Sequence, residues 1–486
     1  MRTTDLVGQC GTFKKNMKRE LRQMNLRDKM HSEMASKALF EQAAGYALDY
    51  AQHINQRGVF PTQSALLNLE QFVEALPVGH GDAEQILSDL HNLGSPASVA
   101  TNAGRYFGFV TGGVLPVGLA ARWLTDFWDQ NSALYLMSPI TAQLEAITER
   151  WLRELFGLPS QVIASFLSGS STAIFCGLAA ARFRICKNQG WDFNQQGHNG
   201  APRIRIVAGD SIHGSVIKAA ALLGFGLDNI EWVDSDDQGR LIQSKLPGLD
   251  QNTIVILQAG HVSTGSFDPI DAVCDTANQV GAWVHIDGAF GLWAAATKHL
   301  GKLTKGMEKA QSWSVDAHKT LNAPYDNGIL LCSDREALVS ALQLSGSYVN
   351  FSEHRDGMLY TPEMSRRARA IELWAALKYL GSDGIDELVY GLHERAVQFA
   401  RELTLANFKV LNEVVFNQVL VGFDWSKEAT VEFTDLVQQS GECWVGSANW
   451  HGKAVVRISV CSWATTAEDV SRSIASFIKA REAVVC

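Results

Sequence analysis

The sequence predicts an α/β protein in which a mostly parallel, wound sheet forms a large domain and a smaller α/β domain follows it. Between about residues 160 and 335, short β-rich runs alternate with helical runs, and the β-rich runs are continuously apolar. Such strands are typical of a parallel sheet that helices cover on both faces. After about residue 383 this alternation is lost, which indicates an antiparallel sheet.

The expected elements follow from these patterns. Strands are expected in the large domain over residues 162–167, 204–207, 230–233, 253–257, 283–286 and 328–331. A long helix is expected over residues 365–380, with Gly381 as its C-terminal cap. The smaller domain is expected to contain strands over residues 408–411, 419–423 and 455–460 and a last helix over residues 467–481.

The first hundred residues are expected to form a helical arm. From about residue 30, apolar residues recur at mixed helical spacing: Leu66, Leu67, Leu69, Phe72, Val73 and Leu76. Basic residues crowd the start of the chain: Lys14, Lys15, Lys18, Arg19, Arg22, Arg27 and Lys29. A solvated extension is favoured over a nucleic-acid or membrane role for this run. The predicted domains are therefore 1–100, 101–381 and 382–486.

The composition indicates a globular enzyme. The 486 residues are 46% hydrophobic and 19% charged, and the net charge of −9 argues against nucleic acid as the main partner. The cysteines form no Cys-x-x-Cys pair, which is typical of a reducing compartment. No signal peptide and no apolar run long enough to span a membrane is visible, and no metal site is predicted. We therefore expect a cytoplasmic protein.

Two polar motifs follow predicted strands. In the first, residues 168–172 (Ser-Gly-Ser-Ser-Thr) lie between a strand and a helix, where free backbone N–H groups and the helix dipole attract a phosphate. Ser170 and Ser171 add hydroxyl groups; the alternative is a helix cap without a ligand. In the second, His213 lies between a strand and a helix, where its ring can lie against an aromatic cofactor. A purely structural histidine is the alternative.

An acid and a lysine complete the predicted site. Asp287 ends an apolar strand, where a carboxylate is costly unless it is paired, and the small Ala289 leaves room for a ring over the backbone. Lys319 follows His318 at a bend, where we expect burial near cationic groups to lower the pKa of the lysine. A lysine that holds an aldehyde and a carboxylate that holds a ring nitrogen protonated together predict a pyridoxal 5'-phosphate (PLP) site.

Two further residues are candidates for substrate contact. Arg457 is a charge inside an apolar strand, and its partner is expected to be either the substrate carboxylate or a structural acid. Tyr348 lies in a polar, Gly-containing stretch, where a phenol could protonate a carbanion. Residue types alone leave both roles open.

These segments resemble the PLP-dependent group II amino-acid decarboxylases, which include the aromatic L-amino acid, glutamate and diaminobutyrate decarboxylases. The resemblance covers about residues 60–480 and is strongest at residues 285–291 (His-Ile-Asp-Gly-Ala-Phe-Gly) and 316–326 (Asp-Ala-His-Lys-Thr-Leu-Asn-Ala-Pro-Tyr-Asp). Residues 105–109, 265–269 and 365–369 resemble the family more weakly. The resemblance implies the aspartate aminotransferase-like fold (fold type I) and an obligate homodimer with its site at the interface and an N-terminal arm around the partner.

The resemblance also implies residue roles. Lys319 would form the Schiff base, Asp287 would bind the pyridine nitrogen, and His213 would stack on the ring. Ser170, Ser171 and His318 would serve the phosphate, Tyr348 would be the catalytic-loop tyrosine, and Arg457 would bind a carboxylate. Phe109 falls in the substrate-side entry segment. His261 replaces a smaller residue common in the family and is expected to shape the pocket.

The implied activity is removal of the α-carboxylate of an L-amino acid to give an amine and CO2. Other PLP chemistry on an amino acid is the alternative: an aldolase or carbon–carbon lyase, a transaminase, or a decarboxylative aldehyde synthase. A PLP-binding protein without turnover is a further alternative, supported only by the basic N-terminal run. The sequence does not identify the substrate.

Overall fold

The computed structural model describes residues 25–342 and 353–485. The chain divides into two compact units, Met1–Ala100 and Thr101–Cys486. Most of the basic N-terminal run lies outside the described residues, as does Tyr348. Within the described residues, no helix combines the length and the apolar character that a membrane span requires.

The first unit is helical, as predicted. Its elements are α2 (Leu26–Ala35), α3 (Ala38–His53), α4 (Gln63–Asn68), η1 (Leu69–Phe72), α5 (Ala83–Asp89), η2 (Leu90–Gly94) and α6 (Ser95–Ala97). Tyr46 on α3 shares a hydrogen bond of 2.8 Å with Ser88 Oγ and stacks on His91 at 4.1 Å. The described residues of α2, α3 and α5 include no buried side chain, so this unit has little apolar core of its own.

The second unit contains the predicted wound sheet. Its strands are β1 (Ile163–Leu167), β2 (Arg205–Gly209), β3 (Ile230–Val233), β4 (Thr253–Gln258), β5 (Trp283–Asp287), β6 (Ser312–Asp316) and β7 (Gly328–Cys332), in the order β1-β7-β6-β5-β4-β2-β3. β7 is antiparallel to both neighbours, and the other pairings are parallel. β1 therefore runs in the same direction as β6.

Helices cover both faces of this sheet, as continuous apolar strands require. On β4, Ile254 and Ile256 belong to a core with α9 (Ser170–Asn188), α11 (Gly214–Leu222) and α13 (Arg335–Leu342). Val255 and Leu257 belong to the opposite core, with α8 (Pro139–Leu155) and α12 (Ile270–Gln279). This split follows from the strand period of two residues, which sends successive side chains to opposite faces.

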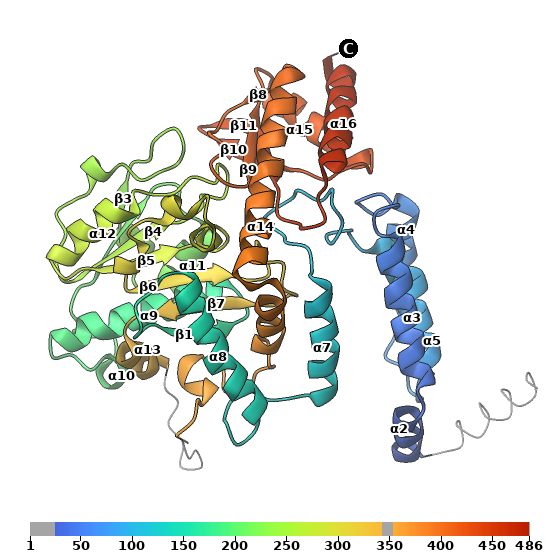
Figure 1. Ribbon diagram of the computed structural model, residues 1–486, viewed down its shortest axis with the longest axis horizontal. Helices are drawn as coiled ribbons and strands as arrows, with labels where there is room; N and C mark the ends of the chain where they lie inside the picture. The colour runs from blue at the N-terminus through green and yellow to red at the C-terminus, as the bar shows by residue number, and fades with distance from the viewer. Residues whose placement is uncertain (1–24, 343–352, 486) are drawn as a thin grey trace, which may run out of the picture. The chain divides into compact units, whose positions relative to one another are not determined.

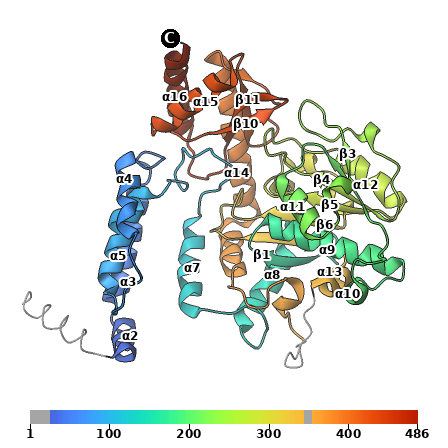
Figure 2. The same cartoon turned by 180° about the vertical axis from the view of Figure 1, so that it is seen from behind.

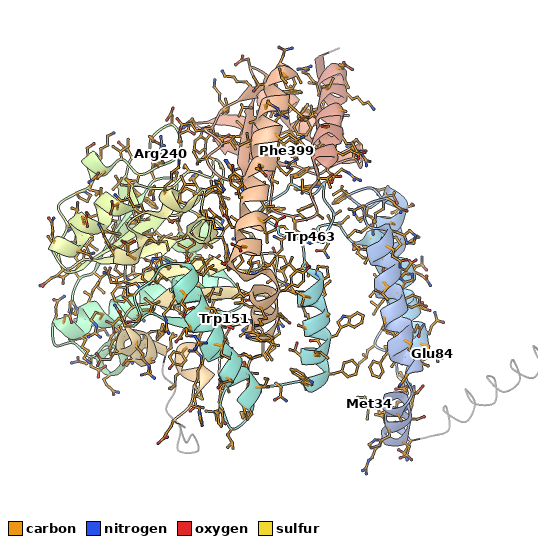
Figure 3. All side chains as sticks on the ribbon, viewed as in Figure 1. Met34, Glu84, Trp151, Arg240, Phe399 and Trp463 are labelled. Carbon is orange, nitrogen blue, oxygen red and sulfur yellow. The ribbon has the colours of Figure 1, made fainter. Side chains whose placement is uncertain are left out.

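One long helix connects the two sheets of this unit. α14 (Ala370–Leu405) runs from the seven-stranded sheet to the C-terminal sheet (Figure 1). At Gly381 the backbone leaves the helical conformation with φ 60°, where the sequence predicted a helix end. In the first half, Trp374 stacks on Trp151 of α8 at 6.2 Å (Figure 3). α14 also packs on α7 (Pro116–Trp128).

The predicted start of this helix at residue 365 is wrong. The helix begins at Ala370, because the preceding arginines are held in tertiary ion pairs instead. Arg366 binds Glu145 at 2.7 Å, and Arg367 binds Asp326 at 3.0 Å.

The C-terminal sheet is antiparallel, as predicted, and has the order β10-β11-β9-β8. Its strands are β8 (Lys409–Val410), β9 (Gln418–Gly422), β10 (Gly446–Trp450) and β11 (Lys453–Ser459), with helices α15 (Lys427–Gln439) and α16 (Ala467–Val485) (Figures 1 and 2). β10 was not predicted, because its Gly-Ser-Ala-Asn-Trp sequence is poor in strand-forming residues and none of them is buried. Phe399 on α14 packs into the core of this sheet (Figure 3).

Two leucines near the end of α14 give a matched test of this core. Leu403 is fully buried in it, whereas Leu405 is 76% exposed. We expect Leu403→Ala to lower the stability of this region by about 2–5 kcal/mol, because it leaves a cavity. Leu405→Ala should change stability by no more than about 0.5 kcal/mol. Thermal unfolding followed by circular dichroism measures both, and equal effects of the two substitutions would contradict the packing described.

Candidate active site

The predicted site residues collect at one edge of the seven-stranded sheet. Because β1, β2, β5 and β6 run in the same direction, Ser170, His213, Asp287 and Lys319 all follow or end strands at this edge. Ligands bind outside the carboxyl ends of the strands in such sheets. The structure therefore brings together the four segments that the sequence singled out, and the role of each side chain stays a prediction.

Lys319 is held by a carboxylate. Its Nζ lies 2.8 Å from Asp316 Oδ2, and its side chain is 20% exposed. Burial lowers the pKa of Lys319, but Asp316 and Asp287 raise it more, so the pKa ends above its ordinary value. The expectation of a lowered pKa is therefore wrong for this structure, because carboxylates outweigh burial around the ammonium group.

Asn322 fixes the loop that carries Lys319. Its side-chain oxygen accepts hydrogen bonds from Gly113 N at 2.8 Å and Trp463 N at 2.9 Å. Its side-chain nitrogen donates to Thr320 O at 2.8 Å and Cys461 O at 2.9 Å. Asn322 has φ 60°, a conformation that asparagine tolerates better than most residues. One buried amide thus joins the lysine loop to two distant segments.

Asp287 is a buried acid with few partners. It is 6% exposed and accepts hydrogen bonds from Ser314 Oγ at 3.0 Å and Ala289 N at 3.2 Å. Burial raises the pKa of Asp287 above its ordinary value, although His213 and Lys319 act in the opposite direction. A cationic group placed against this carboxylate would stabilise its charged form, which is what a protonated pyridine nitrogen supplies.

His213 lies at the edge of the sheet as the N-cap residue of α11. Its Nδ1 accepts a hydrogen bond from Ser215 N at 3.2 Å and lies 2.7 Å from Ser215 Oγ. The pKa of His213 is lowered, mainly because the surrounding protein desolvates the ring. The charges of Lys319 and Arg457 lower this pKa further, and Asp287 opposes them. A neutral imidazole fixed at one nitrogen can present its flat face to an aromatic ligand.

Ser170 and His318 both adjoin Asp316, a residue that the sequence analysis did not single out. The Asp316 carboxylate accepts hydrogen bonds from Ser170 N at 2.6 Å and Ser170 Oγ at 2.7 Å. His318 Nε2 lies 3.7 Å from the same carboxylate, and its Nδ1 accepts from Asn327 N at 3.0 Å. Ser171 is exposed beside them. A signal for Asp316 was present, since it ends a mixed hydrophobic and polar run directly before the bend that carries Lys319.

Arg457 on β11 is a half-buried cation without an acidic partner among the described residues. Its Nη1 donates to Val262 O at 3.2 Å, while Nε is buried without a hydrogen-bond partner. Among the residues that the structure describes, no carboxylate lies within salt-bridge distance of Arg457. Burial lowers the pKa of Arg457. Of the two partners considered, a structural acid is therefore not found in the described part of the chain.

Aromatic rings adjoin Arg457. Phe109 is 63% exposed and stacks on Trp444 at 5.8 Å, and Tyr106 stacks on Trp444 at 5.2 Å. Tyr106 and Arg457 are close enough for the guanidinium to act on the pKa of the phenol. Sequence reasoning missed Trp444, because nothing in its local pattern indicates a neighbour more than three hundred residues away.

His261 uses both ring nitrogens within the protein. Nε2 donates to Ser211 O at 3.1 Å, and Nδ1 accepts from Ser263 N at 3.2 Å. Burial lowers the pKa of His261 to about 4, so the ring is neutral. Because both ring nitrogens are engaged within the protein, the predicted effect of His261 on the pocket would come from the bulk of its ring.

The described residues fit PLP at three points and leave one conflict. A lysine, a buried carboxylate and a neutral imidazole share one edge, which matches an aldehyde, a ring nitrogen and an aromatic face. The conflict is Asp316, because its carboxylate already accepts the hydrogen bond from Ser170 N that a phosphate group at this position would need. The described residues include no group of three or more His, Cys, Asp or Glu side chains able to hold a metal ion.

Comparison with known proteins decides the family. A family model described as the pyridoxal-dependent decarboxylase conserved domain matches residues 67–424. The chain belongs to the pyridoxal-dependent decarboxylase family. This confirms the predicted family and PLP as the cofactor, and it makes the protein a lyase of the carboxy-lyase type.

Individual relatives are distant. The chain is 23% identical to an aromatic-L-amino-acid decarboxylase of Bacillus atrophaeus over 451 residues, which cover 88% of this chain and 92% of the relative. It is 27% identical to the acidic amino acid decarboxylase GADL1 of Mus musculus over 341 residues, which cover 66% of this chain and 60% of the relative.

Solved structures share the fold, as predicted. The crystal structure of mouse CSAD matches with a TM-score of 0.84 and 22% identity, covering 92% of this chain and 98% of that one. Oryza sativa TDC with PLP and tryptamine matches with a TM-score of 0.83 and 20% identity, covering 96% and 99%. The predicted fold type I architecture is confirmed.

The lysine anchor can be tested by spectroscopy. We expect Lys319→Ala to abolish the visible absorbance of lysine-bound PLP, because Lys319 is the lysine whose Nζ pairs with Asp316 at this edge. Lys298→Ala is the matched control, since Lys298 is an exposed lysine paired with Asp383 at 3.0 Å. Borohydride reduction followed by peptide mass spectrometry locates the modified lysine. A pyridoxyl group on any other lysine of the wild-type chain would refute the assignment.

Proposed function

We propose that the protein removes the α-carboxylate of an L-amino acid to give the amine and CO2. The observation that carries the proposal is Arg457, a half-buried guanidinium with a buried, unpaired Nε and no acidic partner in the described residues, which acts on the pKa of His213. A partly desolvated cation of this kind gains from an anionic ligand. The carboxylate of an amino acid is such a ligand, and it would be held near Lys319 and Asp287.

Each residue has a distinct part in this reaction. PLP, when bound, supplies an electron sink for the bond that breaks. Asp287 would keep the ring nitrogen protonated, His213 would support the ring face, and Lys319 would hold the aldehyde carbon of PLP. Arg457 orients the substrate through its carboxylate. The electron pair of the broken bond stays with the substrate, and one proton must return to Cα.

The proton donor is proposed to be Tyr348. This residue lies outside the described residues, so its assignment rests on its place in the sequence and on the family resemblance. Phe109 is proposed to lie on the substrate side, beside Trp444.

Other PLP chemistry is the second candidate. One solved structure with the same fold is Rhodiola rosea 4-hydroxyphenylacetaldehyde synthase, with a TM-score of 0.81 and 21% identity, covering 95% of this chain and all of that one. A decarboxylative aldehyde synthase therefore stays an alternative, as do a transaminase and a carbon–carbon lyase. Which bond breaks depends on how the substrate is oriented at Cα.

We also propose that the protein acts as a homodimer in the cytoplasm. Helix α7 exposes large apolar side chains: Leu119, Trp123, Leu124, Phe127 and Trp128. In the first unit, Met34, Leu48 and Leu67 are each more than half exposed. Exposed apolar side chains gathered on one helix, as on α7, are typical of an interface. The described cysteines are free and buried, which suits a reducing compartment.

A substrate panel tests the reaction. We expect the purified holoenzyme to release CO2 from at least one common L-amino acid or close analogue and to form the matching amine in equal amount. The product identifies the reaction: an amine indicates decarboxylation, a keto acid indicates transamination, and an aldehyde with ammonia indicates a decarboxylative aldehyde synthase. If no member of the panel yields CO2, the proposed decarboxylation is wrong.

Arg457 can be tested by the effect of its charge on KM. Arg457→Met keeps the apolar length of the side chain but removes the cation. We expect KM to rise about tenfold or more, because a charge-assisted hydrogen bond to the substrate is lost. The absorbance of bound PLP should be unchanged. The control is Arg472→Met, because Arg472 lies on α16 and is already paired with Glu442 at 2.7 Å. An unchanged KM in Arg457→Met would show that this residue does not bind the substrate.

A further inference from the structure

Asp316 contacts both Ser170 and Lys319 at this edge of the sheet. It is 1% exposed, and its two oxygens meet the N–H and hydroxyl of Ser170 and the Nζ of Lys319. Ser170 is the first residue of α9, a helix of 19 residues whose preceding Gly169 supplies no side-chain cap. The first N–H of this helix is therefore satisfied by a carboxylate from β6, a different part of the chain.

The surrounding groups keep Asp316 negative. Burial raises its pKa, but Lys319, His318 and the hydrogen bond from Ser170 lower it more. The same ion pair keeps Lys319 protonated, as described above. An ammonium group cannot attack an aldehyde. Lys319 must first give a proton to solvent, and water must leave as the carbon–nitrogen bond forms.

We propose that Asp316 competes with the phosphate group of PLP for the N–H of Ser170 and opposes the attachment of Lys319 to the aldehyde. A phosphate at the start of α9 would face the same backbone donor and the same dipole end that Asp316 now uses. Two anions on one donor repel each other, so PLP binds only as Asp316 withdraws from Ser170 or becomes neutral. Asp316 thereby sets how tightly and how fast the protein takes up its cofactor.

The simpler alternative is that Asp316 only caps α9. A cap would stabilise the helix without affecting phosphate affinity, since its removal would merely expose an N–H group to water. The two interpretations therefore predict different results for a neutral residue of the same shape at this position.

The test uses the full chain after removal of PLP and three probes. Inorganic phosphate reports on the phosphate position alone, pyridoxal reports on Lys319 alone, and PLP reports on both. Dissociation constants for pyridoxal and PLP follow from absorbance titration. The constant for phosphate follows from its inhibition of PLP uptake. None of these measurements needs a substrate, so they remain valid if the proposed decarboxylation is wrong.

We expect Asp316→Asn to bind inorganic phosphate and PLP about tenfold more tightly or better, in line with the value of a charge-assisted hydrogen bond. Pyridoxal should attach faster at neutral pH, because Lys319 loses the carboxylate that holds its proton. Glu336→Gln is the charge-matched control. Glu336 pairs with Arg184 at 2.8 Å after the far end of β7, and its loss should leave all three probes unchanged.

Two outcomes would overturn the proposal. Unchanged phosphate affinity in Asp316→Asn would leave Asp316 as a helix cap only. Weaker phosphate binding would mean that Asp316 supports the cofactor instead of opposing it. Thermal unfolding of the cofactor-free variant shows whether the fold survives. If Asp316→Asn does not fold, Asp316→Ser provides the second test. It also removes the negative charge beside Ser170, so it should also tighten phosphate binding, and weaker binding would refute the competition.

Discussion

The ion pair between Lys319 and Asp316 depends on several segments that are far apart in the sequence. Asp316 must end β6 at the same edge at which β1 delivers Ser170, and this requires β1 and β6 to run in the same direction across the antiparallel β7. The loop with Lys319 must then bend back, which Asn322 achieves by joining residues near 113 and 463. A change of strand order or of this single amide would separate the charges.

The sequence predicted most of the fold and located the segments with Ser170, His213, Asp287 and Lys319 that meet at one edge of the large sheet. Continuous apolar runs located six of the seven strands of the large sheet closely, since such strands pack on both faces and carry a strong local signal. β6 was not predicted as a strand, because serines interrupt its apolar residues. β10 and the start of α14 were missed, because tertiary contacts decide them: β10 pairs with β11, and Arg366 and Arg367 are drawn to Glu145 and Asp326.

Electrostatics was the least predictable part of the site. Nearby cations were expected to lower the pKa of Lys319, but Asp316 and Asp287 raise it instead. No local sequence pattern indicates which charges surround the lysine. Likewise, His261 could be recognised as unusual but not as a residue whose ring nitrogens both bind the backbone of neighbouring segments. Residue type indicates which chemistry is available, whereas burial and long-range partners decide which protonation state is present.

The division of α14 between two apolar clusters has a consequence for how the second unit unfolds. Residues of α14 up to Val389, on both sides of the bend at Gly381, pack in a cluster of the seven-stranded sheet, and residues from Leu392 onward pack in the cluster of the C-terminal sheet. Heat or denaturant can therefore melt the C-terminal cluster while the sheet that carries Lys319 stays folded. Unfolding of this chain should be analysed as more than one cooperative transition, and a single midpoint would average over parts of unequal stability.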